Sequence, residues 1–151
     1  NDVVGYEEVM CLIVFIGSNN PLPLIPWNPE KPAFHVKPIE EYDKPVLNHF
    51  KMPYVYYIGA NEACGCGFNG ADSSLIHEPN ELVDSHKNLQ DLYEYVNRAL
   101  VSNPYVVFYS CEASDIDKRP TEADRIAITN FKSGDFYFKE GVVLTVSLRA
   151  T

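Results

Sequence analysis

The cysteines are the residues whose type and spacing could do chemistry. Cys64 and Cys66 alternate with glycines in a polar loop, and Cys111 follows the apolar residues 105–109. Thiolates and a nearby imidazole are the ligands that zinc prefers. We therefore expect a metal site formed by Cys64, Cys66, Cys111 and His77, with Glu112 as the alternative to His77 and zinc as the metal. The spacing is unusual, because Cys-x-Cys is less typical of zinc sites than Cys-x2-Cys and no second pair follows.

Two other chemistries compete for the same loop. The paired thiols could form a reducible disulfide or act as nucleophiles, which requires a lowered thiol pKa. Residues 52–86 contain no Lys or Arg to lower it. The glycines Gly65, Gly67 and Gly70 also spell G-x-G-x-x-G after an apolar stretch, as phosphate-binding loops do. Nine residues separate Gly70 from the first expected helical residue, which disfavours a phosphate.

A purely structural interpretation stands beside these. Cysteine is among the most buried residue types, so Cys11 and Cys111, which both lie in apolar surroundings, are expected to pack in the core. The loop glycines are then expected to supply positive φ angles in a tight turn. His86, which fills a gap in an apolar helical stripe, is interpreted as a core histidine.

One βαβ unit is expected to position the loop. Residues 53–59 and 104–111 read as strands, and residues 79–102 repeat apolar side chains at helical spacing. Because such crossovers make the two strands parallel, both carboxyl ends meet at one edge, where open sheets place ligands. Cys11 joins that edge only if its own strand runs antiparallel to both. We expect ligand binding there by Glu62, Gly65, Gly67 and Glu112.

The rest of the chain predicts an α+β fold. Residues 9–16 read as a strand buried on both faces, and six prolines between 20 and 38 indicate an extended surface loop with an edge strand at 33–37. Residues 43–51 predict a short helix, 121–131 a helical turn followed by a strand, and 136–148 a hairpin. The expected architecture is a mixed β-sheet of about five to seven strands with one long amphipathic helix and one or two short helices. Residues 1–9 are taken as an N-terminal extension that lacks order, and 10–151 as one domain.

Charge and composition limit the partners. The formal net charge is −9, and residues 61–117 carry −8 of it, from ten acidic and two basic residues. Nucleic acid and anionic membranes require a basic surface, so neither is expected as a partner. The longest apolar run has eight residues, far fewer than the roughly 20 of a membrane helix. The acidity favours a cation or a neutral small ligand at the predicted edge.

These observations favour a small cytoplasmic binding or regulatory domain with a ligand or metal site after the strands 53–59 and 104–111. The few cysteines and the absence of an Asn-x-Ser/Thr motif support the cytoplasmic assignment. One alternative is a cysteine-dependent enzyme that uses the same edge, with Glu62 or Glu112 in acid–base work, although no familiar catalytic motif is present. Another is an interaction protein without a small-molecule site, which forms homo-oligomers through its aromatic strands and proline segment.

Overall fold

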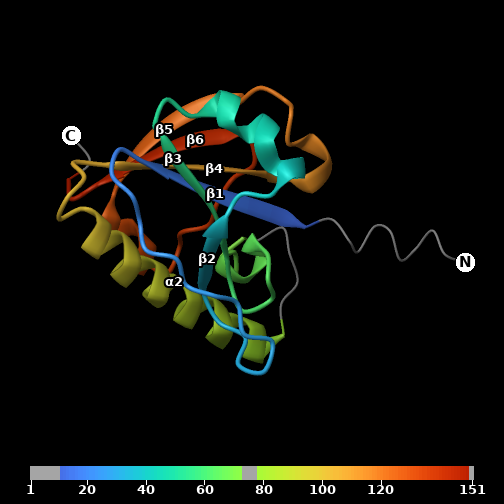
Figure 1. Cartoon of the computed structure of the whole chain (residues 1–151). Coiled ribbons are helices and arrows are strands. Elements are labelled where there is room, and N and C mark those ends of the chain that lie inside the picture. The colour runs from blue at the N-terminus through green and yellow to red at the C-terminus, as the bar shows by residue number, and fades with distance from the viewer. Residues whose placement is uncertain (1–10, 73–77, 150–151) are drawn as a thin grey trace, which may run out of the picture.

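The protein folds around one six-stranded mixed sheet. The computed structural model describes residues 11–72 and 78–149, so the expected extension 1–9 and His77 lie outside the described residues. The strand order is β2-β3-β1-β4-β6-β5, and one long helix, α2, accompanies the sheet (Figure 1). This confirms the predicted α+β class. The elements are β1 (Leu12–Ser18), β2 (His35–Pro38), β3 (Tyr54–Gly59), α2 (Pro79–Ala99), β4 (Val106–Glu112), β5 (Glu122–Ala127) and β6 (Val142–Ser147).

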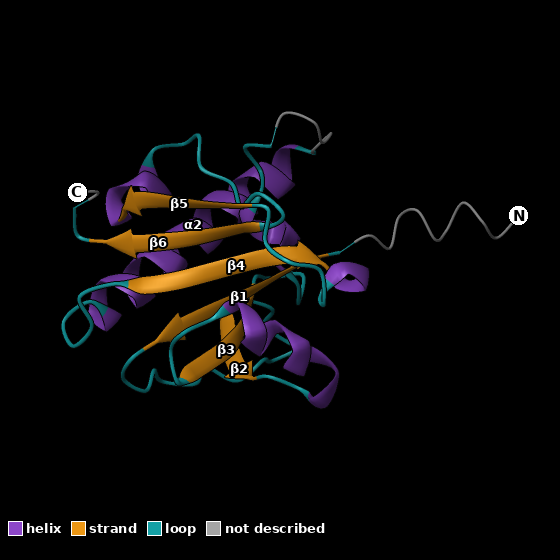
Figure 2. Ribbon diagram, turned by 90° about the horizontal axis from the view of Figure 1, so that it is seen from above, coloured by secondary structure: helices purple, strands orange, loops and turns teal. Residues whose placement is uncertain are grey.

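The sheet buries side chains on both faces. The helix α2 covers one face, and a short 3-10 helix, η1 (Glu41–His49), covers part of the other (Figure 2). Every residue of β1 is buried, as the apolar run predicted. Because side chains alternate along a strand, Val14 and Ile16 join the core under α2, whereas Ile13 and Phe15 join the smaller core under η1.

The central strand β1 decides what meets at the edge of the sheet. It pairs antiparallel with β3 on one side and with β4 on the other, with Val14 opposite Ile58 and Leu12 opposite Glu112. The strands β3 and β4 are therefore parallel to each other, as the βαβ prediction requires, but β1 lies between them. The start of β1 consequently lies beside the ends of β3 and β4. Because β1 runs antiparallel to both strands, Cys11 lies at the same edge as the loop after β3.

The proline-rich segment 20–38 runs along the surface as expected. Its short strand is β2, the edge strand next to β3, and Ile25 forms an antiparallel bridge with Val36 of β2. The amide of Leu22 also donates a 3.0 Å hydrogen bond to the hydroxyl of Tyr56 on β3. The hydroxyl group of Tyr95 on α2 donates a 2.6 Å hydrogen bond to the carbonyl of Pro23. This contact holds the segment against the helix.

The C-terminal third differs from its prediction in two places. The strand in 121–131 comes first, as β5, and the helical turn follows it as the 3-10 helix η4 (Ile128–Lys132). The predicted hairpin partner of β6 does not form, because Phe136 and Phe138 pack against the ring of Phe131 instead of entering a ladder. β6 pairs with β4 and, in parallel, with β5. Among the described residues, no helix is long and apolar enough to cross a membrane.

Candidate metal centre

Three cysteine sulfur atoms meet at the edge of the sheet where β1 begins. The Sγ atoms of Cys11, Cys64 and Cys66 all lie within 4.8 Å of one another. Cys11 directly precedes β1, and the other two lie in the loop that follows β3. All three are free thiols and half-buried. The group therefore joins two segments that are more than 50 residues apart in the sequence.

The loop that carries Cys64 is fixed by backbone hydrogen bonds. The amide of Ala60 donates to the carbonyl of Cys64 at 2.9 Å, and the amide of Ala63 donates to the carbonyl of Ala60 at 3.0 Å. Ala63 has a φ of 72°, a left-handed conformation that alanine rarely adopts. The hydroxyl of Tyr57 donates a 2.7 Å hydrogen bond to its carbonyl and so stabilises this turn.

The glycines of the loop allow close packing. A Cβ atom on Gly65 would lie 2.4 Å from Cγ2 of Val14, and one on Gly67 would lie 2.6 Å from Cβ of Ala60. One on Gly70 would lie 2.7 Å from the side chain of Ser85. None of these three glycines has a positive φ, so the expectation that they supply such angles is wrong. The space beside each is filled by protein, which leaves the phosphate-loop interpretation without support.

Polar side chains of α2 hold the other end of the loop. Nδ2 of Asn88 donates to the carbonyl of Gly67 at 3.0 Å and to Oδ1 of Asn61 at 2.8 Å. Oγ of Ser85 accepts a 2.9 Å hydrogen bond from the amide of Gly70. Both helix residues are buried. His86, interpreted from the sequence as a core histidine, is instead exposed, because the buried stripe of the helix passes through Ser85 and Asn88.

Hydrogen bonds converge on the sulfur of Cys66. The amide of Leu12 donates to it at 3.3 Å, and the thiols of Cys64 and Cys11 also donate to it. These donors, led by the Cys64 thiol, lower the pKa of Cys66 to about 6, although burial and the carboxylate of Glu62 oppose the shift. The hydrogen bond from the Cys64 thiol to Cys66 also raises the pKa of Cys64 far above its usual range, because it stabilises the protonated thiol. Within the group, the hydrogen bonds thus favour a thiolate at Cys66 over one at Cys64.

The other predicted site residues have different surroundings. Cys111 does not belong to the group of three sulfur atoms; it is 2% exposed and packs with Ile13 and Phe15 in the core under η1. Burial raises its thiol pKa to about 12. Glu62 is exposed beside the cysteine loop.

Glu112 takes part in a second, acidic group. Ligand oxygens of Glu112, Asp115 and Glu140 lie within 4.8 Å of one another. Burial and the neighbouring Glu112 raise the pKa of Glu140. Lys118 forms a 3.1 Å ion pair with Asp115 and partly balances the charge. The sequence predicted Glu112 at this edge but not Glu140, which arrives from the loop before β6.

Known proteins do not add to this description. No protein-family model matches the chain, and neither a curated protein nor a solved structure resembles it at a significant level.

Proposed function

We propose that this chain is a binding or regulatory domain that holds a thiophilic metal ion through Cys11, Cys64 and Cys66. The observation that carries the proposal is the convergence of the three sulfur atoms within 4.8 Å. In a tetrahedral zinc site, two Zn–S bonds of about 2.3 Å place the sulfur atoms about 3.8 Å apart. The observed limit of 4.8 Å between the sulfur atoms is compatible with that spacing.

The surroundings favour a cation. Residues 52–86 contain no Lys or Arg, so no basic side chain of this segment balances the charge of the thiolates. Glu62 adds a further negative charge close to Cys66. Soft thiolate ligands select zinc or copper(I) over magnesium or calcium. Three thiolates suffice for copper(I), whereas zinc takes a fourth ligand; Glu62 lies in the same loop, and His77 is the fourth ligand predicted from the sequence.

A metal also accounts for the number of cysteines better than a disulfide does. One disulfide joins two sulfur atoms at about 2.05 Å and leaves the third unpaired. A bound metal uses all three at once. It also ties the start of β1 to the loop after β3, so that binding stabilises the fold.

The proposal is tested by metal titration of the reduced protein. Cobalt(II) serves as a probe because its thiolate complexes absorb strongly, and zinc then displaces it. We expect one equivalent to bind, Cys66→Ser to lose about 100-fold or more in affinity, and Cys111→Ala to bind unchanged. Loss of binding in both Cys66→Ser and Cys111→Ala would instead support the ligand set predicted from the sequence. No thiolate band in the wild-type protein would overturn the proposal.

A cysteine-dependent enzyme is the second candidate. It is favoured by the hydrogen bond from the Leu12 amide, which stabilises a Cys66 thiolate as a nucleophile requires. In that case Cys66 alone would react rapidly with iodoacetamide, and the protein would bind no metal. The titration above, followed by alkylation, separates the two candidates.

A further inference from the structure

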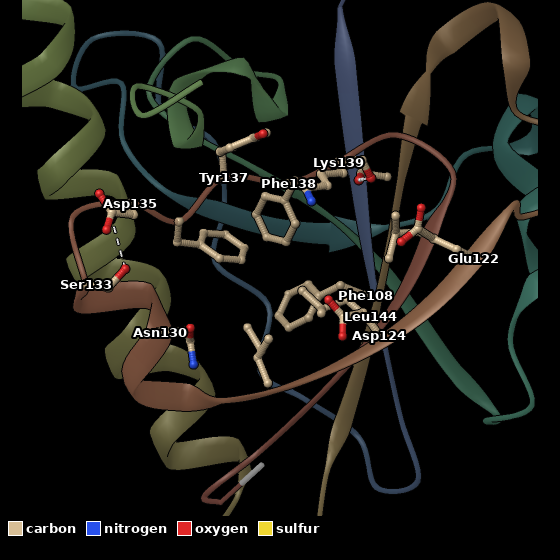
Figure 3. Close-up of a pocket in the computed structure, with 14 residues that line it drawn as sticks. Phe108, Glu122, Asp124, Asn130, Ser133, Asp135, Tyr137, Phe138, Lys139 and Leu144 are labelled. Carbon is tan, nitrogen blue, oxygen red and sulfur yellow. Dashed lines mark hydrogen bonds between the residues drawn. The ribbon is translucent and has the colours of Figure 1, made fainter. Parts of the chain in front are cut away.

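We propose that a second site, a pocket between β5 and the segment 133–139, binds an organic ammonium ion with an aromatic or other apolar body. The pocket has a volume of about 290 Å³. It is lined by apolar side chains at its floor and by carboxylates at its rim (Figure 3). It uses none of the three cysteines.

The floor is formed by the α2 side of the sheet, at strands β4 and β6, and its side chains belong to the same core as the buried residues of α2. Phe108 of β4 lies opposite Leu144 of β6, and Leu144 lies beside Asp124 of β5. Residues in register project from the same face of a sheet. Phe108 and Leu144 are buried, and Phe138 completes the floor from the opposite wall. A pocket with this floor takes an apolar body.

The rim carries an excess of negative charge. Glu122 and Asp124 stand on β5, and Asp135 stands on the opposite wall, with the rings of Phe108 and Phe138 between them (Figure 3). Among the described residues that line the pocket, Lys139 is the only basic one. The four charged side chains therefore sum to −2. Arg125, the next residue on β5, projects to the other face of the sheet by strand alternation and does not neutralise the rim.

The arrangement fits an organic cation better than a metal ion. Within residues 11–72 and 78–149, the groups of three or more ligand atoms closer than 4.8 Å include none of the rim carboxylates. Asp124 accepts a 2.8 Å hydrogen bond from the adjacent amide of Arg125. The described residues offer no ion-pair partner to Glu122 or Asp135. Both carboxylates are free to receive N–H donors.

The size of the pocket limits the ligand. A cavity of about 150 Å³ accommodates benzene, so 290 Å³ holds one aromatic ring and a short aminoalkyl chain. The ring would pack on Phe138 and Leu144 while the ammonium group meets the rim. The aromatic floor adds attraction for a cation that lies over a ring face. The class is therefore a monoamine with one ring.

Three small probes of similar shape test the proposal. We titrate the protein with 2-phenylethylamine, with its neutral analogue 2-phenylethanol and with the anion 3-phenylpropionate, and follow backbone amide shifts by NMR. We expect saturable shifts with the amine in residues 133–139 and in β5, and at least about tenfold weaker binding of the other two. The affinity for the amine should also fall as salt is raised.

Variants locate the site. Asp135→Asn and Glu122→Gln should each weaken amine binding about tenfold, whereas Glu30→Gln, an exposed carboxylate outside the pocket, should leave it unchanged. All three positions are exposed, so the variants are expected to fold. Equal binding of the three probes, or no amine binding up to about 10 mM, would overturn the proposal.

Discussion

The backbone amide of Leu12 donates a hydrogen bond of 3.3 Å to Sγ of Cys66, 54 residues further along the chain. Leu12 is the first residue of the central strand, and Cys66 lies in the 3-10 turn η2 (Gly65–Phe68) after β3. The bond satisfies a strand amide at the edge of the sheet and fixes the sulfur beside Cys11. The proposed metal centre thus depends on how closely this turn approaches β1.

Gly65→Ala tests that approach. The added Cβ would lie 2.4 Å from Cγ2 of Val14 and 3.1 Å from the carbonyl of Leu12, so the turn must move away from β1. We expect the free energy of unfolding to fall by about 1–3 kcal/mol and the affinity for zinc to fall with it. Chemical denaturation and metal titration measure the two effects.

Val14→Ala provides the control for this clash, because it removes the atom that Gly65→Ala would strike. In a double-mutant cycle, Gly65→Ala should cost less in the Val14→Ala background than in the wild type. Strict additivity would show that the clash is not the cause.

Asn69 links the cysteine loop to the wall of the second pocket. Its Nδ2 donates to the carbonyl of Phe138 at 2.9 Å, and its Oδ1 accepts from the amide of Phe138 at 2.8 Å. Asn69→Ala leaves both buried backbone groups without these partners, so we expect a loss of about 2–4 kcal/mol in unfolding free energy. Asn130→Ala is the matched control; its single bond to Ala127 is exposed, and its cost should stay below about 0.5 kcal/mol. Equal losses in the two variants would refute this role.

Zinc should protect the cysteines from alkylation. In the metal-free protein, we expect iodoacetamide to modify Cys66 fastest, because its pKa is lowered, and the half-buried Cys11 and Cys64 more slowly. Cys111, which is 2% exposed, should not react. One equivalent of zinc should slow all three reactions, because metal-bound thiolates are shielded. Peptide mass spectrometry reports each site, and unfolding in urea should expose all four. Unchanged rates with zinc would count against the metal centre.

His35 should make stability depend on pH. The residue is 2% exposed, and its ring centroid lies 4.6 Å from that of Trp27 with the two rings tilted by 59°. Its Nδ1 donates a 3.0 Å hydrogen bond to the carbonyl of Ala33. Burial lowers its pKa below 6.5, so the unfolded chain takes up a proton that the folded protein refuses. The contribution of His35 to stability is full above pH 6.5 and is lost below it, by up to about 1.4 kcal/mol per pH unit.

Comparison with His35→Gln isolates this effect, because glutamine does not titrate. Burial raises the pKa of Asp43 and gives the opposite trend with pH, but Asp43 is present in both proteins. The difference in unfolding free energy between wild type and variant should shrink from pH 7 to pH 5. A constant difference would contradict the prediction.

The sequence predicts the strongly patterned elements well. The apolar run at 9–16 becomes the buried β1, and the helical repeat at 79–102 becomes α2. Cys11 lies close to Cys64 and Cys66 because β1 runs antiparallel to β3 and β4. The composition of the sequence does not determine that direction. The sequence likewise does not determine on which face of the sheet Cys111 lies. Because β4 is buried on both faces, an apolar residue fits either one.

Polar residues that are buried could not be predicted from the hydrophobic pattern of the sequence. Ser85 and Asn88 continue the stripe of Leu92, Tyr95 and Ala99 at spacings of three and four, but their polarity shifted the predicted stripe toward His86. Their hydrogen bonds to the cysteine loop could be found only once the loop had a position. The order of β5 and η4 was reversed for a similar reason, since a capping-box pattern at 121–124 competed with the strand alternation that prevailed.

X-ray absorption spectroscopy of the zinc-loaded protein tests the central claim most directly. We predict about three sulfur neighbours around each zinc ion at about 2.3 Å, falling to two in Cys11→Ser and staying at three in Cys111→Ala. Zinc surrounded only by nitrogen and oxygen, or a sulfur count that does not change in Cys11→Ser, would contradict a centre formed by Cys11, Cys64 and Cys66.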